Sequence, residues 1–291
     1  MSENTSKWAY LFVLSLIWGS SFILMKKALI GVTPFQLGAL RNIFTALILF
    51  TVGLKYIKTI DKTAWKWIAL SGVFGSFIPA FLFAIAETEI DSAIASILNS
   101  LVPLQTILVG FAVFQIASTK RQIFGVVLGF IGTALLVMEG ADLNPHQNYL
   151  YAGYIVLATV MYAFNVNIIK SHLQHLKPLT IATGNYVVVV IPAFIILLFT
   201  GFFESSNLHQ PALKMALVYI FILSFFGTAL AKVLFNKLIR ISTPVFASSV
   251  TYVMPIVALT WGFLDGEGFS LLQGFASLII LLGVYLANKK A

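Results

Sequence analysis

The sequence contains ten apolar segments, each close to the length that an α-helix needs to cross a lipid bilayer. About 20 predominantly apolar residues are required, because a helix rises about 1.5 Å per residue and the hydrocarbon layer is about 30 Å thick. Lipid offers no partners to backbone N–H and C=O groups, so segments of this length are expected to be helices. The segments are 8–25, 34–54, 67–86, 92–114, 122–139, 149–169, 179–200, 213–235, 244–263 and 271–287.

The composition agrees with a membrane protein. Hydrophobic residues make up 59% of the chain and charged residues 10%, whereas about a quarter of a soluble domain is charged. We therefore predict an all-α polytopic protein with ten transmembrane helices in the plasma membrane, or in the inner membrane of a bacterium. The absence of cysteine excludes disulfides and thiol catalysis. The net charge of +8 does not indicate nucleic acid, because the basic residues lie in short loops.

The basic residues predict the orientation of the chain. If the N-terminus is cytoplasmic, 14 of the 18 Lys and Arg residues lie on the cytoplasmic side, as the positive-inside rule requires. Lys232 is counted among them, on the expectation that its side chain extends to the cytoplasmic surface. Both termini are therefore predicted to be cytoplasmic.

A polar pattern occurs twice in the sequence. The stretch 95–103 reads ASILNSLVP, and 152 residues later the stretch 247–255 reads ASSVTYVMP. In each, polar residues and a proline fall at i, i+3, i+4 and i+7, so they share one helical face. An unpaired polar group is costly in hydrocarbon, so both faces are expected inside the bundle or along a hydrated cavity. The polar residues of the two faces are Ser96, Asn99 and Ser100, and Ser248, Thr251 and Tyr252.

The repeat extends through both halves of the chain. Trp18 and Tyr162 lie 144 residues apart, as do Ser21 and Asn165. We predict two repeats, 8–139 and 149–287, packed as one membrane unit. Five spans per repeat is an odd number, so the repeats must be inverted relative to each other. Inverted repeats are typical of secondary transporters, which hold the substrate near the membrane midplane.

Several short motifs resemble a known family. The run WGSSF begins at Trp18, Lys26 follows it, Arg41 lies early in the second span, and Pro103 and Pro255 interrupt the fourth and ninth. Together these resemble the EamA-type members of the drug/metabolite transporter superfamily, over nearly the whole chain. The resemblance implies a carrier of small metabolites that often exports amino acids or related compounds. The later spans add Gln122, Gly125 and Gly132, echoed by Gln273 and Gly283.

The candidate binding residues have two readings each. The two polar faces either line a translocation cavity or form hydrogen bonds between helices. Trp18 and Tyr162 either face a substrate or pack within the bundle, since both lie too deep for an interfacial belt. Near Tyr162 only Asn165, at i+3, can share its face, so Asn167 is expected elsewhere. Asn236, late in the eighth span, is a further candidate.

Arg41 is the most costly residue to place in a membrane, roughly 10 Å below the outer surface. It either pairs with Glu87 or Glu89 or reaches outward, or else it binds a substrate carboxylate. No Asp or Glu lies near the middle of a predicted span. We therefore expect facilitated exchange or loosely proton-coupled export.

These features favour a secondary transporter of small organic metabolites, an exporter or exchanger that works by rocking one repeat against the other. The alternatives are an intramembrane enzyme, although no HExxH or GxSxG motif is present, and a non-transporting scaffold. No cofactor or metal site is expected. The glycines Gly125, Gly129 and Gly132 favour packing of the fifth span on the tenth over dimerisation, so we expect a monomer or a weak homodimer.

Overall fold

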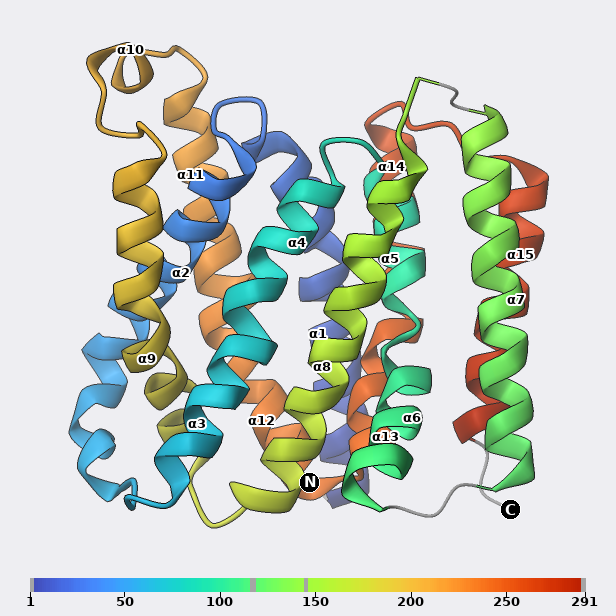
Figure 1. Cartoon of the computed structure of the whole chain (residues 1–291), viewed down its shortest axis with the longest axis horizontal. Coiled ribbons are helices and arrows are strands. Elements are labelled where there is room, and N and C mark those ends of the chain that lie inside the picture. Colours follow the sequence, from blue (N-terminus) through green and yellow to red (C-terminus); the bar gives the residue numbers. More distant parts are fainter. Residues whose placement is uncertain (1–2, 116–118, 144–145, 289–291) are drawn as a thin grey trace.

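The computed structural model describes residues 3–115, 119–143 and 146–288, and these residues form helices and turns without any strand (Figure 1). The elements in chain order are α1 (Glu3–Ala28), α2 (Pro34–Gly53), η1 (Leu54–Thr59), α3 (Ala64–Gly72), η2 (Val73–Phe77), α4 (Ile78–Ala86), α5 (Ser92–Asn99), α6 (Val102–Phe114), α7 (Lys120–Leu143), η3 (Tyr149–Tyr151), α8 (Ala152–His172), α9 (Pro178–Phe199), α10 (Ser205–Leu208), α11 (Leu213–Ser224), η4 (Phe225–Leu230), α12 (Ala231–Ile241), α13 (Pro244–Ser248), η5 (Ser249–Tyr252), α14 (Met254–Leu264) and α15 (Leu271–Asn288).

Eight helical runs in the described part of the chain are long and apolar enough to cross a membrane. They coincide with eight of the ten predicted segments, so the prediction of a polytopic all-α protein is confirmed to that extent. The other two predicted segments lie in α7 and α15, where the apolar stretches Ile123–Glu139 and Leu271–Gly283 are shorter. The count of ten spans therefore stays a prediction.

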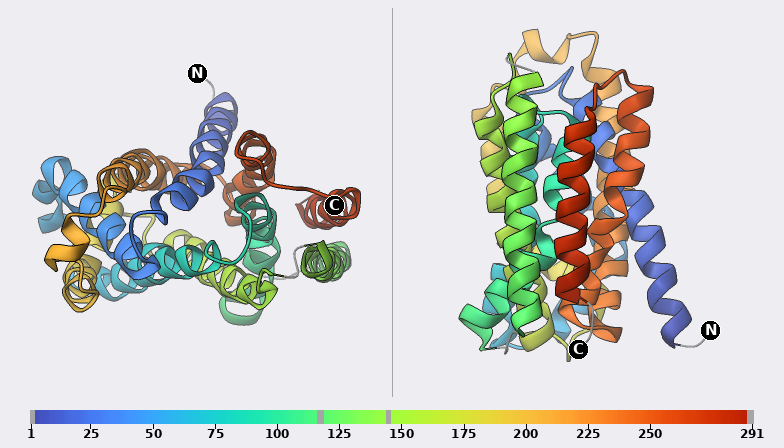
Figure 2. Two further views of the ribbon diagram at one scale, coloured as in Figure 1. Left: turned by 90° about the horizontal axis from the view of Figure 1, so that it is seen from above. Right: turned by 90° about the vertical axis from the view of Figure 1, so that its right-hand side faces the viewer.

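The helices run up and down across one bundle. The two ends of the chain lie at the same end of it, and α1 runs in the opposite direction to α8, its equivalent in the second half (Figure 1). Viewed from above, most helices surround a central region, and the pair α7 and α15 stands at one side (Figure 2).

Each half contains one helix with a π-helical turn and one broken helix. The π-helical turns η2 and η4 begin 152 residues apart, at Val73 and Phe225. The sequence predicted continuous, proline-kinked helices at the two polar stretches, but the helices end there instead. Helix α5 ends at Asn99 before α6 begins, and α13 ends at Ser248 before η5 and α14. Each proline lies in the first turn of the following helix, where its missing N–H costs nothing.

Helices α7 and α15 pack against each other at glycines. A Cβ atom added to Gly283 would lie 2.6 Å from the carbonyl oxygen of Gly125, and one added to Gly132 would lie 2.8 Å from the backbone nitrogen of Ile280. These glycines therefore let two backbones approach closely within one chain. The predicted packing of the fifth span on the tenth is present in the structure.

Substitution of Gly283 tests this close packing. Gly283→Ala should lower the free energy of unfolding by about 1–3 kcal/mol, because the added methyl group pushes two backbones apart. Thermal unfolding of the purified protein in detergent measures the loss. Gly153→Ala in α8 is the matched control, since nothing lies within 4 Å of the added Cβ. Equal unfolding temperatures for both variants would contradict the observed packing.

Candidate functional site

A cavity lies between the two halves, inside the ring of helices. The space open to water-sized molecules is about 120 Å³, far more than the roughly 10–15 Å³ that one water needs. Most of its lining residues occupy equivalent positions in the two repeats. These pairs are Trp18 and Tyr162, Ser21 and Asn165, Phe22 and Val166, Asn42 and Tyr186, Gly75 and Gly227, Ser76 and Thr228, Ala80 and Lys232, Phe83 and Phe235, Asn99 and Thr251, and Val102 and Met254.

Aromatic contacts in the cavity join one half to the other. Trp18 of the first half meets Phe235 of the second edge to face, with ring centroids 5.0 Å apart. Tyr162 of the second half stacks on Phe83 of the first, with centroids 6.0 Å apart. The Trp18 indole N–H also donates to the Gly227 carbonyl oxygen at 2.8 Å, within the π-helical turn η4. The aromatic walls are therefore fixed by contacts between the halves.

Two cations reach this cavity. Arg41 in α2 donates through Nε to the Thr228 hydroxyl at 2.9 Å. No ion pair links Arg41 to Glu87 or Glu89, so that reading of Arg41 is wrong. Lys232 in α12 is 7% exposed and donates to the Ser76 hydroxyl at 2.5 Å. The expectation that Lys232 extends to the cytoplasmic surface is therefore wrong, because its side chain lines the cavity.

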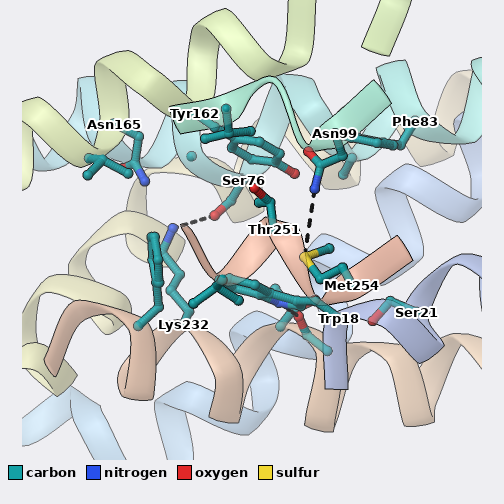
Figure 3. A pocket seen from close by; sticks show the side chains of 18 of the residues that line it. Trp18, Ser21, Ser76, Phe83, Asn99, Tyr162, Asn165, Lys232, Thr251 and Met254 are labelled. Carbon is teal, nitrogen blue, oxygen red and sulfur yellow. Dashed lines mark hydrogen bonds between the residues drawn. The ribbon is translucent and has the colours of Figure 1, made fainter. Parts of the chain in front are cut away.

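The cavity also presents amide oxygens that have no hydrogen-bond partner among the described residues. The Asn99 side chain donates to the Met254 sulfur at 3.9 Å, which leaves its Oδ1 atom buried and unpaired. Asn236 donates to the Pro178 carbonyl oxygen at 3.2 Å, and its Oδ1 atom is likewise unpaired. Figure 3 shows Lys232 directed at Ser76 on one side of the cavity and Asn99 directed at Met254 on the other. Buried acceptors of this kind are satisfied when water or a ligand donates to them.

The two polar faces divide between the cavity and the protein interior. Asn99, Ser248 and Thr251 line the cavity. The hydroxyls of Ser248 and Thr251 donate to carbonyl oxygens of their own segment, at 3.0 Å each. Ser100 donates to the Thr251 carbonyl oxygen at 3.2 Å and so connects the halves, while Ser96 is fully buried. Ser96, Ser100 and Tyr252 are not among the residues that line the cavity.

Near Tyr162 the structure separates the two asparagines. Asn165 lines the cavity and accepts a hydrogen bond from the Ser71 hydroxyl at 2.7 Å. Asn167 donates to the carbonyl oxygens of Thr106 and Ala163, away from the cavity. Ser21 lines the cavity while its hydroxyl donates to Ile17 in its own helix.

Sequence reasoning missed several lining residues. Ser76 and Thr228 lie 152 residues apart, as repeat partners do, but nothing in the sequence showed that a π-helical turn directs their hydroxyls inward. Tyr186 is the repeat partner of Asn42, 144 residues on, so the repeat could have found it. Lys232 has no such signal, because its repeat partner is Ala80.

A network of charges joins the halves at one end of the bundle. Glu267 accepts from the backbone N–H groups of Ser92 and Ala93 at 3.2 and 3.1 Å, at the start of α5. It also pairs with Lys26 at 2.8 Å, and Lys26 and Lys27 both pair with Asp265. Hydrogen bonds from these two lysines lower the pKa of Asp265. A carboxylate at free N–H groups of a helix start stabilises that helix.

Glu87 lies beside this network without joining it. Its side chain is buried, and neither carboxyl oxygen has a hydrogen-bond partner among the described residues. Burial raises the pKa of Glu87 well above its ordinary value, and the nearby charge of Glu267 raises it further. Arg41 and Lys26 act in the opposite direction but do not offset burial. Burial therefore favours the protonated form of Glu87, which lies at the end of the third span.

A cavity lined by aromatic and polar side chains, within a bundle of apolar helices, indicates a polytopic membrane protein with room for a small solute. The model of the EamA-like transporter family matches the chain twice, over residues 6–138 and 150–289. The chain therefore belongs to the EamA-like transporter family. A solved crystal structure shares 16% sequence identity, covers 98% of this chain and 96% of its own, and has a TM-score of 0.68, which shows a common fold.

Three relatives illustrate the relationship. An uncharacterized transporter of Archaeoglobus fulgidus is 24% identical over 98% of this chain and 99% of its own length. The inner membrane transporter YedA of Escherichia coli K12 is 24% identical over 96% of this chain and 92% of its own. An S-adenosylmethionine/S-adenosylhomocysteine transporter of Chlamydia muridarum is 23% identical over 89% of this chain and 84% of its own. The chain is a multi-pass protein of the bacterial inner membrane and a transporter.

The raised pKa of Glu87 predicts how stability depends on pH. The folded protein holds this proton more tightly than the unfolded chain, so its stabilising effect is lost as pH rises from the ordinary value of 4.5 through the raised pKa. Glu87→Gln removes this titration, so the variant does not lose this stability as the pH rises. The unfolding temperature of Glu87→Gln minus that of the wild type should therefore be larger near about pH 8 than near about pH 5.

Thermal unfolding in detergent across this pH range measures the difference. Glu89→Gln is the control, because Glu89 lies in the same turn and accepts a hydrogen bond from the Asn148 backbone at 3.2 Å. The control should keep the pH dependence of the wild type. If Glu87→Gln also keeps it, the described environment of Glu87 is wrong.

Proposed function

We propose that this chain is a secondary transporter that exports or exchanges amino acids or related small organic compounds by alternating access. Ten spans form two inverted five-helix repeats, 8–139 and 149–287, with both termini in the cytoplasm. The substrate binds in the cavity between the two repeats and contacts residues from each repeat.

The observation that carries this proposal is the paired lining of the cavity. A site built from equivalent residues of two oppositely directed halves can be reached from either side of a membrane by equivalent movements. The breaks between α5 and α6 and between α13 and α14 place irregular backbone beside the cavity, where it is tolerated. The π-helical turns η2 and η4 add a second pair of sites where a helix can bend.

The substrate class is supported by the chemistry of the lining. Trp18, Tyr162 and Phe235 offer flat apolar surfaces, while Asn99 and Asn236 offer unpaired acceptors. The relative from Chlamydia muridarum is named for two amino acids joined to a nucleoside. A compound with an amino or hydroxyl donor and an apolar body suits both kinds of surface.

The two alternative functions predict different behaviour. Among the described residues that line the cavity, none is Asp, Glu or His, the groups that most often act as general acid or base. A scaffold would not need a cavity with paired polar lining. Neither an enzyme nor a scaffold would produce saturable flux of a solute across a membrane.

Uptake of radiolabelled amino acids into proteoliposomes tests the proposal. We expect saturable flux in the wild type and a loss of at least about fivefold in Asn99→Ala, because the variant removes a hydrogen-bonding amide from the cavity. Ser96→Ala is the matched control, since Ser96 lies on the same helix, is buried, and does not line the cavity. Normal flux in Asn99→Ala, or no saturable flux of any compound in the wild type, would refute the assignment.

A further inference from the structure

Lys232 has no countercharge among the residues that the structure describes. Its ammonium group is buried, donates to the neutral Ser76 hydroxyl, and lies 6.0 Å from the centre of the Tyr186 ring. No ion pair is formed by Lys232 with any carboxylate of the described residues. A charge inside a membrane protein is costly unless a partner or water stabilises it, and such residues usually mark a functional site.

Arg41 brings a second positive charge to the same cavity. Only its Nε atom donates a hydrogen bond within the described residues, so the terminal nitrogens of the guanidinium group remain available. Tyr162 and Tyr186 line the cavity with it. In the part of the chain that the structure describes, no Asp or Glu lines the cavity, so Arg41 and Lys232 face it without an acidic side chain beside them.

Both cations depart from the internal repeat. The position equivalent to Lys232 is Ala80, and the position equivalent to Arg41 is Asn185. Packing requirements are shared between the two halves, as the paired aromatic and hydroxyl residues show. Packing of the shared fold therefore does not require a positive charge at either position.

From these observations we infer that the transported compound carries an anionic oxyacid group, carboxylate or phosphate, that binds between Lys232 and Arg41. The anionic oxygens supply the missing countercharge, and the hydroxyls of Ser76 and Thr228 hold the two cations in place. Guanidinium and ammonium groups both form strong, charge-assisted hydrogen bonds to such oxygens. The apolar part of the compound lies against the aromatic pairs. This inference rests on the proposed transport function and specifies its substrate.

Binding to the full-length protein in detergent tests the inference with probes that share a phenyl ring. These are 3-phenylpropionate and phenyl phosphate as anions, 3-phenylpropanamide as a neutral analogue, and phenethylamine as a cation. We expect at least one anion to raise the unfolding temperature in a saturable manner, and the amide and the amine to bind at least about tenfold more weakly. The two anions distinguish carboxylate from phosphate recognition.

Variants locate the effect. Lys232→Met keeps the length of the side chain without its charge and should weaken binding of the anion at least about tenfold. Lys237→Met is the matched control, because Lys237 lies in the same helix, is exposed, and contacts the Tyr10 ring at 5.1 Å outside the cavity. The control should bind the anion as the wild type does.

Three results would overturn the inference. They are equal binding of the anion and its amide, unchanged anion binding in Lys232→Met, and no binding of either anion. The first and third use the wild type, so they hold even if Lys232→Met fails to fold. Flux of neutral or cationic compounds without anion binding would refute the inference and leave the transport function intact. Anion binding without flux of any compound would support the anion site and refute the transport function.

Discussion

Polar and charged groups inside a membrane protein must find their partners within the protein, and here many find them across the two halves. Trp18 donates to the backbone of η4, Arg41 to Thr228, and Lys232 to Ser76. At one end of the bundle, Glu267 binds the start of α5. These contacts hold the halves together around the cavity. The polar groups that lipid cannot satisfy are therefore largely the ones that form the site.

The site combines symmetry with departures from it. Equivalent aromatic residues, hydroxyls and glycines come from both repeats, and the equivalent helices α1 and α8 run in opposite directions (Figure 1). Such an arrangement suits a cavity that opens to each side in turn. The two cations and the unpaired amide oxygens are not duplicated in this way, so the two halves of the cavity differ in charge and in hydrogen-bonding groups. Residues that are equivalent in the two repeats thus suit the conformational change, while residues present in only one repeat suit recognition of the substrate.

The sequence predicted the positions of the helices well, because apolar length and short polar loops determine them. Repeat pairing also indicated Trp18, Tyr162 and Asn165, which line the cavity together with Arg41 and Asn99. Periodicity alone placed Ser96 and Ser100 on the same face as Asn99, but neither lines the cavity: Ser96 is fully buried within α5, and Ser100 lies in the break that follows α5. The position of Lys232 could not be predicted either, since a lysine near a helix end ordinarily extends to the surface, and only packing of η4 and α12 around the cavity directs it inward.

Cross-linking the two halves tests alternating access most directly. A Cβ atom added to Gly262 in α14 would lie 3.5 Å from that of Ala93 in α5, which suits a disulfide. It would also lie 2.6 Å from a carboxylate oxygen of Glu267, so the end of that side chain must shift to admit it. The chain has no native cysteine, so Ala93→Cys with Gly262→Cys introduces the only pair. If the halves must separate here to move substrate, oxidation will stop flux in proteoliposomes and reduction will restore it. Unchanged flux in the fully cross-linked protein would contradict alternating access.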